Sequence, residues 1–207
     1  FGGLEKLPFY QIIKSQIKEF HNGAFQQDYR YSFIQKTISL LSKLPKALIP
    51  FHNYNINIRT AASEQLFFSK EFMVSEKAMN IHFTIPPKST KAFEESLSKS
   101  IEEISKTDAI QTHVSYSNQK RSTDSVTVNM DNSLYRNQFG NLFFRAAGHG
   151  ALIDNLNDLE EAVVFLSNID NIAVSVYHKK ASFYKKMLAV VLLSTLKRIY
   201  NFNQALE

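Results

Sequence analysis

The chain has 207 residues, a formal charge of +5 and a pI of about 9.2. Its hydrophobic content of 44% and charged content of 21% are ordinary for a soluble globular protein of one domain. Cysteine is absent, which excludes disulfides and thiolate chemistry and fits a cytoplasmic location. The modest basicity suits a polyanionic ligand such as a nucleotide, and no signature of nucleic-acid binding accompanies it.

Two helices are predicted first. Residues Leu4–Phe20 carry apolar side chains at helical spacing, and His21-Asn22-Gly23 is a typical helix end. The second helix is predicted over Tyr31–Leu44. We expect these helices to form a preface, residues 1–44, to an α/β region that covers residues 45–207.

The α/β region opens with Pro45–His52, whose prolines exclude a helix. Lys46 in this rigid loop is a candidate phosphate contact that acts as a point charge, and the alternative is a solvated surface lysine. The next helix is predicted to begin at Arg59-Thr60, with Thr60 as its N-cap.

Strands and helices then alternate along the chain. Asn80–Ile85 predicts a strand, Ser89–Ile104 an amphipathic helix, and Ile110–Tyr116 a second strand. The inward side chains of that helix are expected to be Phe93, Leu97, Ile101 and Ile104. This alternation favours an α/β sheet.

A polar loop, Ser117–Asp124, follows the second strand. Gln119 has a donor and an acceptor that suit a base edge, and Lys120 and Arg121 suit phosphate. The alternative is a solvated turn. A strand over Val126–Met130 and a hairpin turn at Asn137–Asn141 are predicted next.

The stretch Phe143–Asn171 concentrates the candidate chemistry. Its small-residue turn, Ala146–Gly150, leads into a short helix and then into the apolar run Val163–Leu166, which predicts a buried strand. Asp170 would lie at the carboxyl end of that strand, where α/β sheets bind ligands. The stretch therefore indicates an anion-binding loop and a metal-capable carboxylate, or else an ordinary glycine turn and strand.

A long helix, His178–Tyr200, is predicted last, with a packed side formed by Phe183, Met187, Val190, Val191 and Leu193. Its longest apolar run, Met187–Leu193, is far too short to span a membrane, so no membrane partner is expected. Zinc-binding, hydrolase and Walker motifs are missing from the sequence.

The motifs Gly148-His149-Gly150 and Ser167-Asn168-Ile169-Asp170-Asn171 resemble the G-H-G and S-N-I-D-N motifs of UDP-sugar pyrophosphorylases. The chain is more similar still to an uncharacterised bacterial family, a domain of unknown function, that shares these motifs. Four further segments match that family in the same order: Pro45–His52, His82–Pro87, Ser117–Asp124 and Ala147–Ile153. The resemblance therefore covers most of the chain.

This resemblance implies a Rossmann-like, GT-A-like nucleotidyltransferase fold with a mixed, mostly parallel sheet flanked by helices. The implied reaction joins a sugar 1-phosphate to a nucleoside triphosphate and releases pyrophosphate, with positioning and charge neutralisation as the main sources of rate. Asp170 would hold Mg²⁺ and Lys46 would touch phosphate, as the catalytic residues. The resemblance assigns the nucleotide to Gln119, Gly148, His149 and Gly150, and the sugar to Asn168.

Two departures from the family pattern bear on activity. Ala147 replaces the first glycine of the family's G-G-H-G, which reduces the range of backbone conformations that the loop can adopt. The family's N-terminal glycine-rich loop is not found, so we expect an incomplete single domain over residues 1–207 with poor catalysis by itself.

Three functional hypotheses follow. The first is a domain that binds a nucleoside triphosphate or nucleotide sugar, together with a sugar 1-phosphate. The second is a non-catalytic relic of the same fold that serves as a binding module. The third, nucleic-acid binding, is disfavoured and would require steeply salt-dependent affinity. Base, sugar and oligomeric state are left open.

Overall fold

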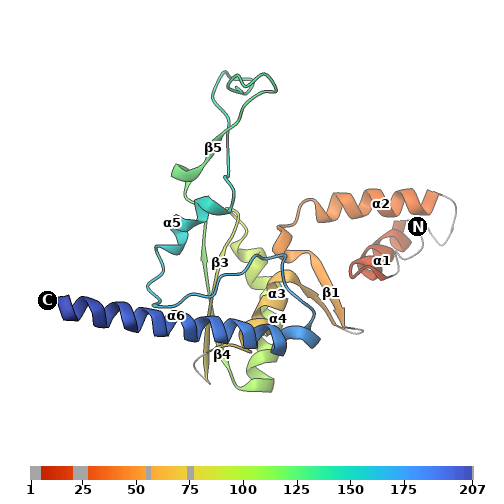
Figure 1. Cartoon of the computed structure of the whole chain (residues 1–207). Helices are drawn as coiled ribbons and strands as arrows, with labels where there is room; N and C mark the ends of the chain where they lie inside the picture. Colours follow the sequence, from red (N-terminus) through yellow and green to blue (C-terminus); the bar gives the residue numbers. More distant parts are fainter. Residues whose placement is uncertain (1–5, 21–27, 55–56, 74–76, 207) are drawn as a thin grey trace.

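The computed structural model describes residues 6–20, 28–54, 57–73 and 77–206 (Figure 1). It is a mixed α/β structure with much helix and small sheets. The helices are α1 (Tyr10–Phe20), α2 (Asp28–Leu41), α3 (Ala61–Ser69), α4 (Thr90–Asp108), α5 (Ile153–Leu156) and α6 (His178–Leu206). The strands are β1 (Pro50–Tyr54), β2 (Asn57–Thr60), β3 (Ala78–Thr84), β4 (Gln111–Ser117), β5 (Ser125–Val126) and β6 (Phe144–Arg145).

The strands form three separate two-stranded sheets, of which β3–β4 alone is parallel in the described part of the chain. The expectation of one continuous, mostly parallel sheet is therefore not met. The predicted strand over Val163–Leu166 is wrong: these residues join no ladder, and Leu166 is 67% exposed. Its apolar sequence predicts burial between layers, but no strand of the described residues lies in register with it.

The core lies between the parallel pair and the helices α3 and α4. As predicted, α4 turns Phe93, Leu97 and Ile104 inward, and all three are buried. Phe93 meets Phe83 of β3 and Tyr116 of β4, with ring centroids 5.9 and 6.0 Å apart. Through these ring contacts, α4 packs against both strands of the parallel β3–β4 pair.

The predicted start of α3 is confirmed. Thr60 is the N-cap, and its hydroxyl accepts a hydrogen bond from the backbone N–H of Ser63 at 3.2 Å. The helix ends at Ser69, and eight of its nine residues are buried, which makes it the central helix of the core.

Two helices precede the α/β region, as predicted, and they pack on each other; the second, α2, begins at Asp28 and ends at Leu41 where Tyr31–Leu44 was predicted. Tyr10 and Ile13 are buried against Leu7, Phe9 and Leu40 in a cluster of their own. Helix α1 begins at Tyr10, after Pro8, and the predicted start at Leu4 and the predicted stop at His21–Gly23 lie outside the described residues.

The segment from β5 to β6 is a narrow two-stranded excursion that projects from the body (Figure 1). The turn at Asn137–Asn141 is confirmed: Asn137 N–H donates to the carbonyl of Asn141 at 2.9 Å, and Gly140 takes a positive φ of 78°. The predicted strand Val126–Met130 is shorter than expected, because beyond Val126 its pairing is reduced to one isolated bridge at Val128.

Helix α6 is longer than predicted, and most of its large apolar side chains are exposed. The five expected core residues, Phe183, Met187, Val190, Val191 and Leu193, are 50–66% exposed. Helical spacing predicts that such residues face a partner, and in this structure the helix instead extends beyond the body (Figure 1). In the described residues, none of the helices combines the length and apolar character needed to cross a bilayer.

His82 connects the two parallel strands through its ring. Nδ1 lies 2.8 Å from the Ser115 hydroxyl of β4, and Nε2 lies 2.9 Å from the Ser117 hydroxyl. Burial lowers the pKa of His82 below its usual value, and the negative charge of Glu161 opposes this shift.

A pH-dependent loss of stability is expected from this histidine. Because the folded-state pKa is lowered, the unfolded chain binds the proton more readily, so stability falls as pH drops below about 6.5. Urea unfolding at a series of pH values checks this, and His82→Gln should lose less stability on acidification than the wild type. A variant whose stability falls as steeply as that of the wild type contradicts the assignment.

Candidate functional site

Two residues from distant motifs come together at the surface. The ammonium of Lys46 lies 3.5 Å from the Oδ2 atom of Asp170, although the two residues are far apart in the sequence. Both side chains are exposed, Lys46 by 78% and Asp170 by 54%. An ion pair this exposed adds little to stability, so it can exchange its partners for a ligand at low cost.

Each residue of the Lys46–Asp170 pair has neighbours in the sequence that are packed in the core. Lys46 opens a short 3₁₀ helix whose next residues, Ala47 and Leu48, are buried in the main core, and Ile169, next to Asp170, packs against the same core. The side-chain amide of Gln65 in α3 donates to the backbone carbonyl of Asn168 at 3.1 Å. The pair is thus exposed but set on a fixed backbone.

Asp170 is a single carboxylate, and the described residues contain no group of three or more histidine or acidic side chains that could hold a metal ion. This donor set does not fit a cage made only of protein ligands. It fits a Mg²⁺ ion that takes one carboxylate, substrate phosphates and waters.

The glycine loop contains Gly148, His149 and Gly150, all exposed. Gly148 has a φ of −71°, and a Cβ atom added at Gly148 or Gly150 would meet nothing within 4 Å. The fold itself therefore requires glycine at neither position. The helix that follows is only a short 3₁₀ turn, His149–Leu152, and the four-residue α5, so the expected helix N-terminus is too short to act as an anion site.

Gln119 belongs to the loop that follows β4. Its amide donates to the hydroxyl of Thr123 at 3.2 Å, which orders the loop. The buried amide of Asn155 in α5 donates to the carbonyl of Asn118 at 2.8 Å and to the hydroxyl of Ser117 at 3.0 Å. The end of β4, the Gln119 loop and α5 are therefore tied together.

The predicted phosphate contact at Lys120 is engaged elsewhere. Its ammonium is 2.8 Å from both carboxylate oxygens of Asp158 and 3.1 Å from the carbonyl of Asp154. The candidate residues thus form two groups. Lys46, Asn168 and Asp170 make one, Gln119 and the glycine loop make the other, and within the described ranges no hydrogen bond or ion pair joins the groups.

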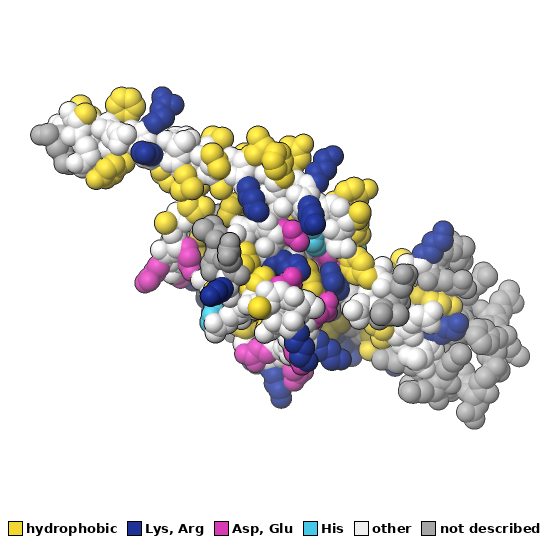
Figure 2. All heavy atoms as spheres, turned by 90° about the horizontal axis from the view of Figure 1, so that it is seen from below, with side chains coloured by type: hydrophobic (Ala, Val, Ile, Leu, Met, Phe, Trp, Pro, Cys, Tyr) yellow, Lys and Arg dark blue, Asp and Glu magenta, His cyan; other side chains and the backbone are white. Residues whose placement is uncertain are grey.

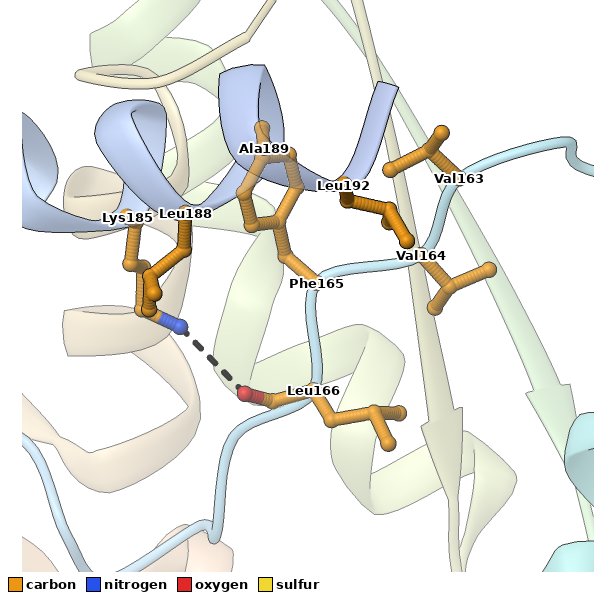
Figure 3. A pocket seen from close by; sticks show the side chains of 8 residues that line it. All are labelled: Val163, Val164, Phe165, Leu166, Lys185, Leu188, Ala189 and Leu192. Atoms are coloured by element: carbon orange, nitrogen blue, oxygen red, sulfur yellow. Dashed lines mark hydrogen bonds between the residues drawn. The ribbon is translucent and has the colours of Figure 1, made fainter. Parts of the chain in front are cut away.

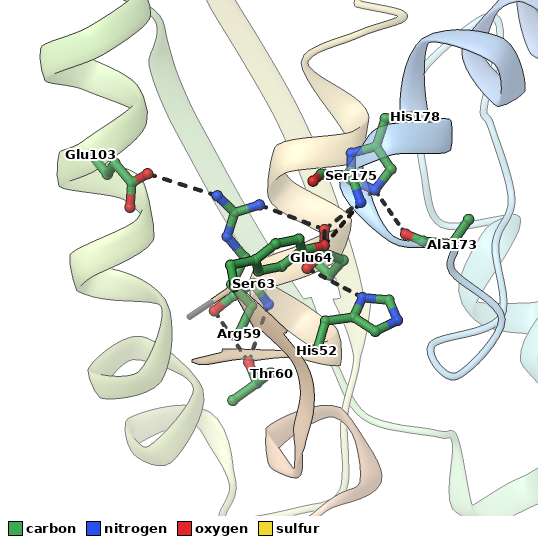
Figure 4. A network of polar contacts seen from close by, with 10 residues as sticks. His52, Arg59, Thr60, Ser63, Glu64, Glu103, Ala173, Ser175 and His178 are labelled. Carbon is green, nitrogen blue, oxygen red and sulfur yellow. Dashed lines mark hydrogen bonds and ion pairs between the residues drawn. The ribbon is translucent and has the colours of Figure 1, made fainter. Parts of the chain in front are cut away.

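A buried polar cluster was missed by the sequence analysis. The carboxylate of Glu64 in α3 is fully buried, and the hydroxyl of Tyr54 donates to it at 2.9 Å. Nitrogen atoms of His52, Arg59 and His178 lie 3.4, 3.5 and 3.3 Å from its oxygens (Figure 4). Arg59 also stacks over the Phe67 ring, 3.5 Å from its centroid.

The cluster joins the β1–β2 hairpin, α3 and the first residue of α6. His178 donates from Nε2 to the carbonyl of Ala173 at 2.9 Å, and the backbone N–H of Ser175 donates to the hydroxyl of Tyr54 at 2.9 Å. Burial raises the pKa of Tyr54, and the hydrogen bond from Ser175 partly opposes this. No short sequence motif marks these residues, because they come from distant segments.

Comparisons with known proteins give one positive result. Neither a search of curated proteins nor a search of solved structures returned a match. A family described as a domain of unknown function, DUF4301, matches residues 1–207. Because this match spans the whole chain, the protein belongs to the DUF4301 family.

Proposed function

We propose that the chain is a nucleotidyltransferase-like domain of Rossmann-like, GT-A-like ancestry that binds a nucleoside triphosphate or a nucleotide sugar. The observation that carries the proposal is the exposed Lys46–Asp170 pair at 3.5 Å. It joins the P-K-A-L segment to the S-N-I-D-N segment, the two motifs to which the sequence resemblance assigns phosphate and metal contacts. An exposed cation and carboxylate on buried supports suit a magnesium–phosphate ligand.

The glycine loop supports the same proposal. Because the fold does not need glycine at positions 148 and 150, their missing side chains leave room on the outside of the loop. Close approach of a ligand to the backbone is one reason for such glycines. In this proposal Gln119 reads the base, His149 contacts the nucleotide, and Asn168 faces the sugar.

The test measures the thermal unfolding of the chain against a panel of nucleoside triphosphates and nucleotide sugars, with and without Mg²⁺. A selective rise of a few degrees is expected, since a ligand that binds only the folded state stabilises it by mass action. Lys46→Ala and Asp170→Asn should abolish the rise. Lys106→Ala, which removes an equally exposed ion pair with Glu102 on α4, should keep it.

Substitutions in the glycine loop sharpen this experiment. Gly148→Ala and Gly150→Ala should leave the midpoint without ligand unchanged, because a Cβ atom meets open space there. The same variants should weaken the ligand-dependent rise. A panel with no shift, or a rise that survives in Asp170→Asn, contradicts the proposal.

The second candidate is a binding module without catalysis. It is favoured by the direct pairing of Lys46 with Asp170, which neutralises the carboxylate that a metal would need. A pyrophosphate-release assay with the nucleotide that shifts the midpoint separates the two candidates. Release that depends on Asp170 supports the transferase, and binding without release supports the module.

A further inference from the structure

Lys185 of α6 is a half-buried cation without an acidic partner. Among the ion pairs of the described residues, none includes its ammonium. The ammonium donates instead to the backbone carbonyl of Leu166 at 3.3 Å and to the hydroxyl of Ser167 at 3.0 Å. Burial lowers the pKa of Lys185, and no negative charge opposes this shift. Because a charge withdrawn from water is costly unless it is paired, this position favours an anion.

Three aromatic rings fix the position of this ammonium. The Nζ atom lies 5.3 Å from the ring centroid of Phe72, 5.5 Å from that of Phe68 and 6.0 Å from that of Phe165. Phe72 packs on the other two rings, with centroids 5.0 and 4.9 Å apart, and both Phe68 and Phe72 are buried. Ring faces at this range attract a cation. The ammonium is therefore held by packed side chains before a ligand arrives, which lowers the cost of binding.

The same lysine lines a pocket between α6 and residues 163–166 (Figure 3). The cavity has a volume of about 330 Å³, and every residue that lines it apart from Lys185 is apolar. Leu188 and Leu192 on the helix side are 69% and 45% exposed, so a ligand can enter from solvent. Small-molecule sites begin at about 300 Å³, so this cavity suits a small apolar group.

The helix that carries Lys185 also favours an anion. Helix α6 has six basic residues and no acidic residue, and Figure 2 shows basic side chains among the hydrophobic ones along it. One ammonium balances the single charge of a carboxylate, whereas a phosphate monoester carries nearly two charges. A pocket that is apolar apart from one cation therefore matches a molecule with an apolar chain and one terminal carboxylate.

We propose that this pocket binds a medium-chain fatty acid. Its carboxylate pairs with the ammonium of Lys185 and accepts a hydrogen bond from the hydroxyl of Ser167, and its alkyl chain lies between α6 and residues 163–166. Neither Lys46 nor Asp170 lines the pocket, so the proposal does not rest on nucleotide binding.

Isothermal titration calorimetry with hexanoate, octanoate, decanoate and octanol tests this proposal. The wild type is expected to bind one fatty acid per chain, and each added methylene group should tighten binding about fourfold as it leaves water. Octanol has the chain of octanoate without its charge. It should bind about tenfold more weakly than octanoate, which is the loss expected for one hydrogen bond to a charged group.

Three variants separate the charge from the cavity. Lys185→Met keeps an unbranched side chain without the charge, so it should bind octanoate about tenfold more weakly and octanol at least as well as the wild type. Lys186→Met is the matched control: this neighbouring lysine is exposed and does not line the pocket, so octanoate binding should be unchanged. Ala189→Phe fills the cavity and should weaken both ligands. Circular dichroism confirms that each variant is folded.

Octanol that binds to the wild type as tightly as octanoate overturns the proposal, and this comparison needs no variant. Octanoate binding that Lys185→Met retains in full, or no binding of any chain length, overturns it as well. Co-sedimentation with anionic vesicles that depends on Lys185, without binding of free octanoate, overturns it in favour of a lipid surface.

Discussion

Replacement of Glu64 by glutamine is expected to cost about 3–5 kcal/mol of unfolding free energy, because it removes the buried carboxylate that pairs with Arg59. The carboxylate is fully buried and receives the Tyr54 hydroxyl, while Arg59 and His178 lie within 3.5 Å of it. Glutamine has a volume similar to that of glutamate, and its side-chain oxygen can still accept the hydrogen bond from the Tyr54 hydroxyl. The loss of unfolding free energy therefore measures the effect of removing the negative charge. Urea unfolding at neutral pH measures it.

The control for this variant is Glu95→Gln. Glu95 is a surface residue of α4 whose side chain is 69% exposed beside Lys91. Exposed ion pairs contribute roughly 0–1 kcal/mol, so the control should unfold almost like the wild type. Equal, small losses in both variants would mean that the buried cluster does not hold α3, the β1–β2 hairpin and the start of α6 together.

Truncation of Phe93 to alanine is expected to destabilise the chain by a similar amount, about 3–5 kcal/mol. Phe93 is 2% exposed and contacts Phe83 and Tyr116, so its removal opens a cavity between α4 and both strands of the parallel pair. The cost includes the lost transfer free energy of the ring and the lost contacts around the cavity. Chemical denaturation followed by circular dichroism gives the value.

Phe139→Ala makes the same change at a residue that is 77% exposed near the tip of the β5–β6 excursion. It should alter the free energy of unfolding by less than about 0.5 kcal/mol. If Phe93→Ala and Phe139→Ala lower the free energy of unfolding by the same amount, the main core is not centred on α4 and the parallel β3–β4 pair. If Phe93→Ala alone is destabilised, the core assignment stands.

Local sequence signals determined several elements of this protein correctly. The amphipathic spacing in α4, the N-cap at Thr60, and the glycine turn near Gly140 all depend on residues within a few positions of each other. These features are fixed by backbone sterics, capping and helical periodicity, which act locally. The β-strand on either side of α4 was predicted for the same reason.

The candidate site could be predicted only in part. The motifs identified Lys46 and Asp170, and the structure brings the two within 3.5 Å of each other. It leaves Gln119 and the glycine loop in a second group, tied to the end of β4 through Asn155. The sequence could not place these groups relative to one another, because their arrangement depends on how distant segments pack.

Only the tertiary structure decided which apolar segments are buried. The run Met187–Leu193 is as apolar as the strands and helices of the core, yet it remains largely exposed. In the equally apolar run Val163–Leu166, Phe165 is half-buried against Phe72 while Leu166 is exposed. Conversely, Glu64 is charged and fully buried, because His52, Arg59 and His178 converge on it from other elements. Periodicity reports what a segment can bury, whereas burial itself requires a partner surface, and that partner is set by contacts between distant parts of the chain.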